Sequence, residues 1–268
     1  MSDEKSSPER TKKSYEEILE QEIEEGLKEL NRPASGLLIS GLSAGLDIGF
    51  GALFMAIMLT LAEGRLAPPV EEILVASMYS LGFIFVIVGR SELFTEHTTL
   101  AVLPVMDRKS SLLSLGRLWA LVYVSNLVGA ALFASLAAFI GPQLGIVAVS
   151  NFGEIAAPLV HHTWWVIVTS GVLAGWLMGL LSWLLVAARE TISQIVVVWL
   201  VTAAIGLGHF HHSIAGSVEV LTAVFALQEY TLAQFFHFLA WTTLGNVIGG
   251  VFFVALVKYS HATRSNAG

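Results

Sequence analysis

Two polar stretches interrupt otherwise apolar segments of this sequence, and they hold most of the side chains that could do chemistry. They occupy residues 89–99 (GRSELFTEHTT) and 206–213 (GLGHFHHS). In the first, Thr95 offers a hydroxyl beside the bulky Leu93 and Phe94. That combination suits a constriction that strips water from a small solute and replaces one of its hydrogen bonds. Ordinary packing beside a helix kink is the alternative interpretation.

The second stretch contains the candidate proton donor, His212. A histidine is inexpensive to bury when neutral, donates a hydrogen bond and exchanges a proton near neutral pH. Because an anion is costly in an apolar passage and its conjugate acid is not, such a group could convert a weak-acid anion into a species able to cross. A plain hydrogen-bond bridge between two helices remains open as the alternative.

The composition indicates the surroundings in which these stretches operate. The 268 residues are 55% apolar and 13% charged, with no cysteine and a mean hydropathy of +0.72. This charge is about half that of a soluble domain, and no disulfide or thiolate-metal framework is possible. We therefore predict an all-α integral membrane protein. A P-loop, a dinucleotide fingerprint and a nucleophile elbow are absent from the sequence, and the net charge is −7, so we expect no enzyme, no cofactor and no nucleic-acid partner.

Six apolar segments of spanning length follow one another at residues 36–62, 72–106, 112–140, 160–188, 192–228 and 232–258. A plain span needs about 20 residues, so the second and fifth are too long, and their polar stretches should break them. Twelve of the 14 Lys and Arg fall on one side of six crossings, which predicts that both termini are cytoplasmic. Residues 141–159 lack Lys and Arg and are expected to form an outer loop.

The expected organisation is a cytoplasmic acidic segment at 1–33, a six-helix transmembrane domain at 34–260 and a cytoplasmic tail at 261–268. Ser14 with Glu17 forms a capping box, and Leu19, Ile23 and Leu27 follow at helical spacing. These residues predict an amphipathic helix in the first segment. It lies at the membrane surface, packs on a partner subunit, or is simply solvated.

An internal repeat accounts for the two broken segments. The sequence GLSAG at 41–45 recurs in related form as GVLAG at 171–175, and Asn126-Leu127-Val128-Gly129 recurs as Asn246-Val247-Ile248-Gly249. Small residues recur in any packed bundle, but the breaks also fall in the matching second and fifth places. Because each repeat has three spans, the second half starts on the opposite side of the membrane and is inverted. In transporters built from inverted repeats, paired interrupted helices mark the transport site. Both breaks should line one cavity, which satisfies their backbone groups.

Four motifs resemble those of the formate/nitrite transporter family, and they occur in order over residues 36–258. They are GRSELFT at 89–95, HHT at 161–163, HSIA at 212–215 and NVIGG at 246–250. The acidic extension and the histidine-rich run are most similar to the YfdC-like branch. The resemblance implies an aquaporin-like fold of six helices, a homopentamer in a bacterial inner membrane with one channel per protomer, and passage of small monovalent anions or their conjugate weak acids. By position it implies these pore residues: His212, Thr95, Phe94, Leu93, Tyr79, Asn126 and Asn246.

The sequence also departs from the family pattern. Leu159 replaces the usual vestibule lysine that draws anions inward, and Glu96 and His97 replace small polar residues. A carboxylate beside the pore repels anions unless Arg90 or a histidine neutralises it. We therefore expect altered selectivity, for which the candidate residues are Glu96, His97, Arg90, Leu159, His211, His161 and His162.

Two further functions are weighed against an anion or weak-acid channel. Leu159 and Glu96 favour a pore for a neutral or cationic small solute. The eight histidines suggest a membrane-embedded metal enzyme as the other alternative, because neutral imidazole is a good metal ligand. The histidine clusters fall at different depths, however, so we expect no metal site.

Overall fold

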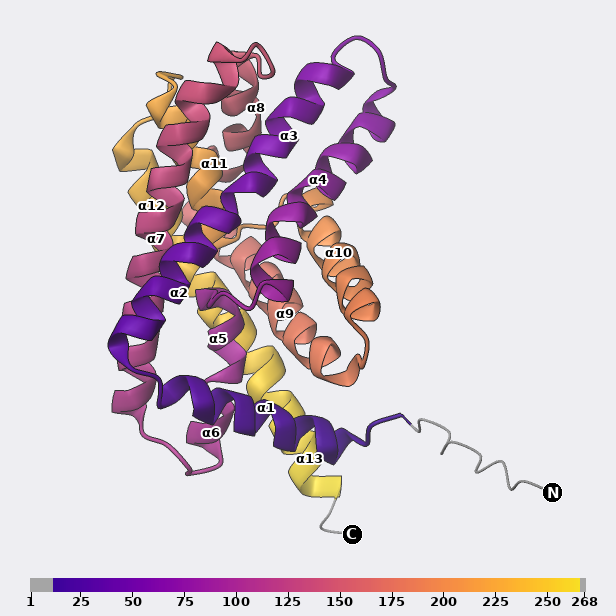
Figure 1. Cartoon of the computed structure of the whole chain (residues 1–268), viewed down its shortest axis with the longest axis vertical. Coiled ribbons are helices and arrows are strands. Elements are labelled where there is room, and N and C mark those ends of the chain that lie inside the picture. Colours follow the sequence, from indigo (N-terminus) through magenta and orange to yellow (C-terminus); the bar gives the residue numbers. More distant parts are fainter. Residues whose placement is uncertain (1–11, 266–268) are drawn as a thin grey trace, which may run out of the picture.

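The computed structural model describes residues 12–265, and every regular element within them is a helix (Figure 1). Residues 1–11 of the expected first segment and residues 266–268 of the expected tail lie outside the described part. In chain order the elements are α1 (Tyr15–Leu30), α2 (Ala34–Asp47), α3 (Gly49–Ala62), α4 (Pro68–Val88), α5 (Phe94–Leu100), α6 (Leu103–Met106), α7 (Leu112–Gln143), α8 (Val149–Val160), α9 (Trp164–Ala187), α10 (Thr191–Leu207), α11 (Ser213–Phe225), α12 (Leu232–Ile248), the π-helix η1 (Gly249–Leu256) and α13 (Val257–Ser265).

Five helical segments in the described part are long and apolar enough to cross a membrane, so the chain is a multi-pass membrane protein. The segments are α2 with α3, then α4, α7 and α9, and finally α12 continued to His261. The predicted fifth span at 192–228 forms two shorter helices, α10 and α11, and neither has spanning length by itself. The break between them falls at the histidine-rich stretch, where the sequence predicted that this long segment is interrupted.

The two breaks have the same local construction. Each preceding helix ends at a glycine, and the next residue, Arg90 or His209, adopts a left-handed conformation with φ of 59° and 48°. In both breaks the backbone N–H of the residue after it donates a hydrogen bond of 3.0 Å to a carbonyl in the last turn of the preceding helix. Left-handed non-glycine residues are uncommon, so the fold holds both sites in a conformation their side chains disfavour.

Close pairs of helices flank the breaks, namely α2 with α7 and α9 with α12. Glycine makes this approach possible. A Cβ added at Gly45 would collide with the backbone oxygen of Asn126, and one added at Gly175 would collide with that of Asn246. The small residues of the sequence repeat are therefore required where the two helices of each pair cross.

Helix α8 is a correction to the outer loop expected at residues 141–159. Its buried residues Phe152, Ile155, Ala156 and Leu159 recur at spacings of three and four, which is the pattern of an amphipathic helix. The helix has 12 residues, too few to cross a membrane, so a search for spans passes over it.

Helix α1 begins with the predicted capping box, in which Ser14 and Glu17 each accept a hydrogen bond from the other's backbone N–H. It runs across the lower end of the molecule, beneath α5 and beside α6 and α13 (Figure 1). Ile18, Ile23 and Leu30 are buried against its own chain. The helix is therefore docked on the protomer, an arrangement that the sequence interpretations did not include.

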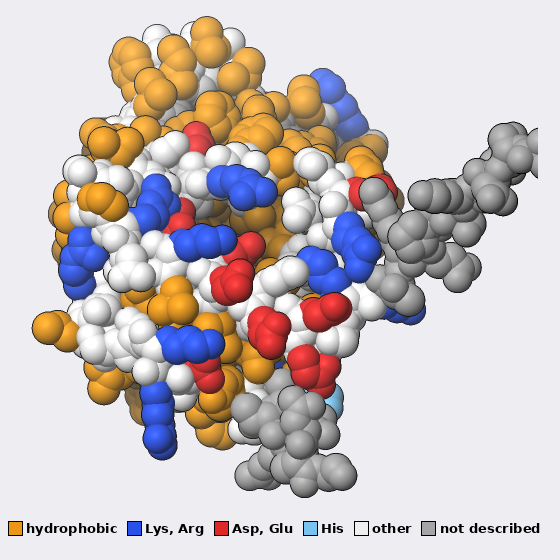
Figure 2. All heavy atoms as spheres, turned by 60° about the horizontal axis from the view of Figure 1, so that its bottom comes forward, with side chains coloured by type: hydrophobic (Ala, Val, Ile, Leu, Met, Phe, Trp, Pro, Cys, Tyr) orange, Lys and Arg blue, Asp and Glu red, His pale blue; other side chains and the backbone are white. Residues whose placement is uncertain are grey.

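The face that carries α1 is the charged face of the molecule. Figure 2 shows Lys, Arg, Asp and Glu side chains gathered there, whereas the surface behind it is largely apolar. Arg117 donates a hydrogen bond to the backbone oxygen of Arg32, and Lys109 pairs with Asp107 at 2.8 Å. Arg32, Lys109 and Arg117, three of the residues on which the predicted orientation rests, thus lie on this side.

Candidate functional site

The two breaks meet at Thr95 and His212. The hydroxyl oxygen of Thr95 lies 2.8 Å from Nε2 of His212, and both side chains are almost fully buried. Thr95 is in the first turn of α5, and His212 is the N-cap residue of α11. The ring of Phe83, from α4, meets the His212 ring edge-on with centroids 5.1 Å apart. Residues from three separate elements therefore close the centre of the molecule.

The hydrogen bonds of His212 assign its tautomer. The backbone N–H of Ala215 donates to Nδ1 at 3.2 Å, so the neutral ring carries its hydrogen on Nε2 and donates it to Thr95. The hydroxyl hydrogen of Thr95 then remains available to a solute. A doubly protonated ring could not accept from Ala215, and a positive charge is unfavourable at a helix N-terminus. This geometry therefore belongs to the neutral histidine.

Asn126 holds the first break. Its side-chain nitrogen donates to the carbonyl oxygens of Gly41 at 2.7 Å and Glu92 at 2.9 Å, and its oxygen accepts from the N–H of Phe94 at 2.9 Å. The side chain is fully buried. One carboxamide thus satisfies backbone groups of α2 and of the unwound segment, which would otherwise be costly in an apolar interior.

Asn246 holds the second break in the same way. It donates to the carbonyl oxygens of Gly171 and His211, both at 2.9 Å, and accepts from the N–H of Ser213 at 2.8 Å. The bonded positions correspond to those around Asn126: a carbonyl two residues before each short helix and the N–H of its first residue. The sequence placed both asparagines near the breaks but did not indicate which groups they bind.

Two cavities approach the centre from opposite ends. The α8-side cavity, about 340 Å³, is lined by residues of α3, α4, α8, α10 and α11, including Tyr79, Leu159 and His212. The α1-side cavity, about 370 Å³, is lined by residues of α1, the first break, α9 and α10, including Glu96 and Arg90. Leu93 and Thr95 have no exposed surface, and the two cavities share no lining residue, so they are separate in this structure.

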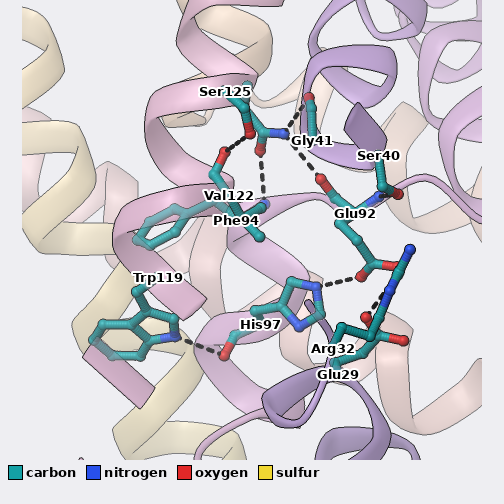
Figure 3. A network of polar contacts seen from close by, with 11 residues as sticks. Glu29, Arg32, Ser40, Gly41, Glu92, Phe94, His97, Trp119, Val122 and Ser125 are labelled. Atoms are coloured by element: carbon teal, nitrogen blue, oxygen red, sulfur yellow. Dashed lines mark hydrogen bonds and ion pairs between the residues drawn. The ribbon is translucent and has the colours of Figure 1, made fainter. Parts of the chain in front are cut away.

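A charged network borders the α1-side cavity (Figure 3). Glu92 pairs with Arg32 and with Nε2 of His97, both at 2.5 Å, and Arg32 also pairs with Glu29 at 2.7 Å. Burial raises the pKa of the Glu29 carboxyl, and the hydrogen bond to Glu29 raises the pKa of Arg32. The network ties α1 to the first break.

This network differs from the expected neutralisation of Glu96 by Arg90 or a histidine. Arg90 is exposed and makes no ion pair with any carboxylate among residues 12–265. The paired carboxylate is instead Glu92, which contacts His97 and Arg32, a residue that follows the end of α1. The physical reason is the left-handed backbone at Arg90, after which the chain turns so that Glu92 faces α1.

The remaining predicted residues lie around this centre rather than in it. The ring of Phe94 packs on Tyr123 and Trp119 of α7, with centroids 4.7 and 5.9 Å away. The Nδ1 atom of His211 lies 2.8 Å from the hydroxyl of Ser170, and its Nε2 lies 3.1 Å from the carbonyl of Leu159. His161 and His162 are exposed, with ring centroids 5.8 Å from Tyr230 and 5.9 Å from His211, respectively.

The membrane metal enzyme needs a cluster of ligands. Among residues 12–265, no group of three or more His, Asp and Glu side chains is arranged to hold a metal ion. The structure therefore offers that alternative no site within the described part.

The sequence did not indicate two residues near His212, one packed on its ring and one in the wall of the α8-side cavity. Phe83 lies one helical turn after Tyr79 on α4, with ring centroids 5.0 Å apart, and covers His212. Glu219 lies two turns after His212 on α11 and lines the cavity. Helical spacing from Tyr79 and from His212 was the available signal for both.

Comparison with known proteins places this geometry among transporters. Residues 16–260 match the family described as Formate/nitrite transporter. The inner membrane protein YfdC of Escherichia coli (strain K12) is 34% identical over 98% of this chain and 82% of its own. A solved FNT family ion channel superposes with a TM-score of 0.81 and 26% identity, covering 91% of this chain and 98% of that one. A pentameric formate channel with formate bound superposes with a TM-score of 0.73 and 27% identity, covering 86% and 98%.

Proposed function

The chain belongs to the formate/nitrite transporter family, and from that membership we propose that it is a membrane channel or proton-linked transporter for small monovalent anions or their conjugate weak acids. Its pore runs between the α8-side and α1-side cavities through the contact of Thr95 with His212. The observation that carries this proposal is that contact, because it places the hydrogen-bonding groups of both breaks at the one closed point between two cavities.

The proposed topology is an aquaporin-like inverted repeat of six spans, in which α10 and α11 together complete the fifth. Supporting it, Asn126 and Asn246 bind equivalent backbone groups, and the glycines that face them, Gly45 and Gly175, meet the same asparagine atoms. The domain limits of 34–260 for the transmembrane part and the pore roles of the predicted residues belong to this proposal. Termini in the cytoplasm agree with the gathering of Lys and Arg on the α1 face.

We propose a homopentamer in a bacterial inner membrane, with one pore in each protomer. Support comes from the neighbour described as a pentameric formate channel and from the relative described as an inner membrane protein. The outer faces of α7, α12 and η1 expose large apolar side chains suited to lipid or to a second protomer: Val124, Val128, Leu132, Leu136, Phe139, Phe236, Leu244, Ile248 and Phe252.

At the constriction, the hydroxyl of Thr95 replaces part of the water lost by the solute. Because Nε2–H of His212 donates to this oxygen, the hydroxyl hydrogen points toward a solute that accepts, as a carboxylate or nitrite oxygen does. For His212 to donate a proton to the solute, the ring must first become doubly protonated and release the N–H of Ala215. Proton transfer is thus coupled to loss of one helix-capping bond.

Formate flux into proteoliposomes, measured over a range of pH, tests the proposal. We expect saturable flux that rises as pH falls, and loss of this pH dependence in His212→Phe. His237→Phe is the matched control, because His237 is an exposed residue of α12 outside both cavities. Flux no greater than in empty vesicles would refute the proposed function. Unchanged pH dependence in His212→Phe would refute the role of the histidine.

Passage of a neutral or cationic small solute is the second candidate function. The observation that favours it is the α8-side cavity, where Leu159 replaces the expected lysine and four glutamates line the wall. In the same vesicles, uptake of an uncharged solute independent of pH, with no formate flux, would select this alternative.

A further inference from the structure

Glu219 is a buried carboxylate that the proposed transport mechanism does not use. Only 7% of the residue is exposed, and it lines the α8-side cavity. It lies seven residues after His212 on α11, about 10 Å farther along the same face of the helix. No described residue from 12 to 265 donates a hydrogen bond to this carboxylate or forms an ion pair with it. Its partner must therefore come from the contents of the cavity.

The rest of the wall makes this cavity attractive to cations. Glu71, Glu72 and Glu154 also line it, and no Lys or Arg among residues 12–265 does. Within the described part of the chain, the only imidazole that lines it besides His212 is that of His209, whose Nε2 lies 3.1 Å from a carboxylate oxygen of Glu72. A concave site lined by charges of one sign concentrates the opposite charge. The cavity therefore favours a positively charged occupant near Glu219.

The neighbours of Glu219 select the kind of cation. The cavity lining is mainly apolar and includes the aromatic residues Tyr79 and Phe210. Small metal cations need several oxygen ligands, and no group of three or more suitable ligands exists among the described residues. A cation with N–H donors is satisfied by one carboxylate together with aromatic faces. The volume of about 340 Å³ accommodates such an ion with water.

We propose that the α8-side cavity is a binding site for a small monovalent cation of the ammonium class, held by a hydrogen-bonded ion pair with Glu219 and by the faces of Tyr79 and Phe210. This site goes beyond the proposed anion or weak-acid transport. The bound cation also provides an exchangeable positive charge in the vestibule, where Leu159 stands in place of the family's lysine.

Binding of radiolabelled methylammonium to the purified full-length protein in detergent tests the site. We expect saturable binding, displacement by ammonium, and at least tenfold weaker displacement by tetramethylammonium, which has the charge but no N–H donor. Glu219→Gln, which keeps the size and removes the charge, should weaken binding at least tenfold. Glu63→Gln is the matched control, because Glu63 is exposed at the end of α3 and does not line the cavity.

Two results would overturn the site: wild-type protein without saturable methylammonium binding, or tetramethylammonium competing as well as ammonium. Both are measured on the wild-type chain, so they decide the matter even if Glu219→Gln does not fold. A folded Glu219→Gln variant that binds like wild type would overturn the role of Glu219. Formate flux, measured after the same purified protein is reconstituted into vesicles, separates the two proposals. Flux without methylammonium binding refutes only the site, and binding without flux refutes only the transport function.

Discussion

Thr95 and His212 lie 2.8 Å apart across 117 positions of sequence, and each belongs to a different broken segment. The pairing brings a hydroxyl and an imidazole to the point that separates two cavities. Neither side chain has another side-chain hydrogen-bond partner among the described residues, so each depends on the other for its orientation. The first prediction follows from that dependence.

Thr95→Val keeps the shape of residue 95 and removes its hydroxyl. The buried Nε2–H of His212 then lacks an acceptor, so we expect the free energy of unfolding to fall by roughly 1 to 3 kcal/mol and formate flux to fall more than tenfold. Thermal denaturation in detergent and vesicle flux measure the two effects. Thr169→Val is the control, because Thr169 is exposed and bonds only to its own helix. Equal losses in both variants would contradict a special role for Thr95.

Asn246→Leu removes a carboxamide that satisfies three buried backbone groups of the second break. We expect a loss of about 2 to 5 kcal/mol of unfolding free energy, because those groups cannot reach water. Asn151→Leu should cost less, since the amide nitrogen of Asn151 donates one bond, to Thr60 at 3.0 Å. Apparent melting temperatures of the two variants give the comparison, and a larger shift for Asn151→Leu would refute it.

Gly175→Ala adds a methyl group where α9 meets the backbone of Asn246. The helices must separate to accept it, so we expect destabilisation of about 1 to 3 kcal/mol. Gly116→Ala in α7 adds the same group in open space and should stabilise by about 0.5 to 1 kcal/mol through helix propensity. Opposite signs of the two shifts in melting temperature are the expected result.

Glu22 makes the docking of α1 depend on pH. It lies outside the membrane-spanning segments, is fully buried, and accepts hydrogen bonds from Ser182 at 2.9 and 3.1 Å. Burial raises its pKa from the usual 4.5 to about 8. The docked state therefore favours the protonated carboxyl, so its stability is greatest below pH 4.5 and is lost progressively as pH rises through about 8.

Hydrogen exchange of the α1 backbone amides, compared between acidic and alkaline buffers, measures this dependence. We expect faster exchange at high pH after correction for the intrinsic rate, and a much smaller pH effect in Glu22→Gln. Glu24→Gln is the control on the same helix, because Glu24 is exposed. Protection of α1 that increases with pH would have the wrong sign for the proposed cause.

Local pattern was sufficient to predict much of this molecule. The apolar segments, the break at residues 89–93, the break before His212 and the capping box of α1 all depend on residues close in sequence. Asn126 and Asn246 were found because each recurs in a repeated motif. These features need no knowledge of which distant segments meet.

The missed features are those that depend on long-range packing. Arg32 reaches Glu92 across 60 positions, so nothing near Arg90 in the sequence indicated the true ion pair. Helix α8 was too short for a search based on spanning length. Glu219 is the single charged residue of α11, and its placement on the wall of a cavity emerges only when α4, α8 and α10 are assembled around it.

The two asparagine side chains also set an order for biogenesis. Asn126 follows the backbone it binds at Phe94 by 32 positions, and Asn246 follows Ser213 by 33. As the chain leaves the ribosome, each unwound segment must therefore wait for the next long helix before its polar backbone is satisfied. The second half of the constriction is completed only when α12, the last long helix, has been inserted. A nascent chain thus cannot form a finished pore early, and truncation before Asn246 should leave His212 without its support.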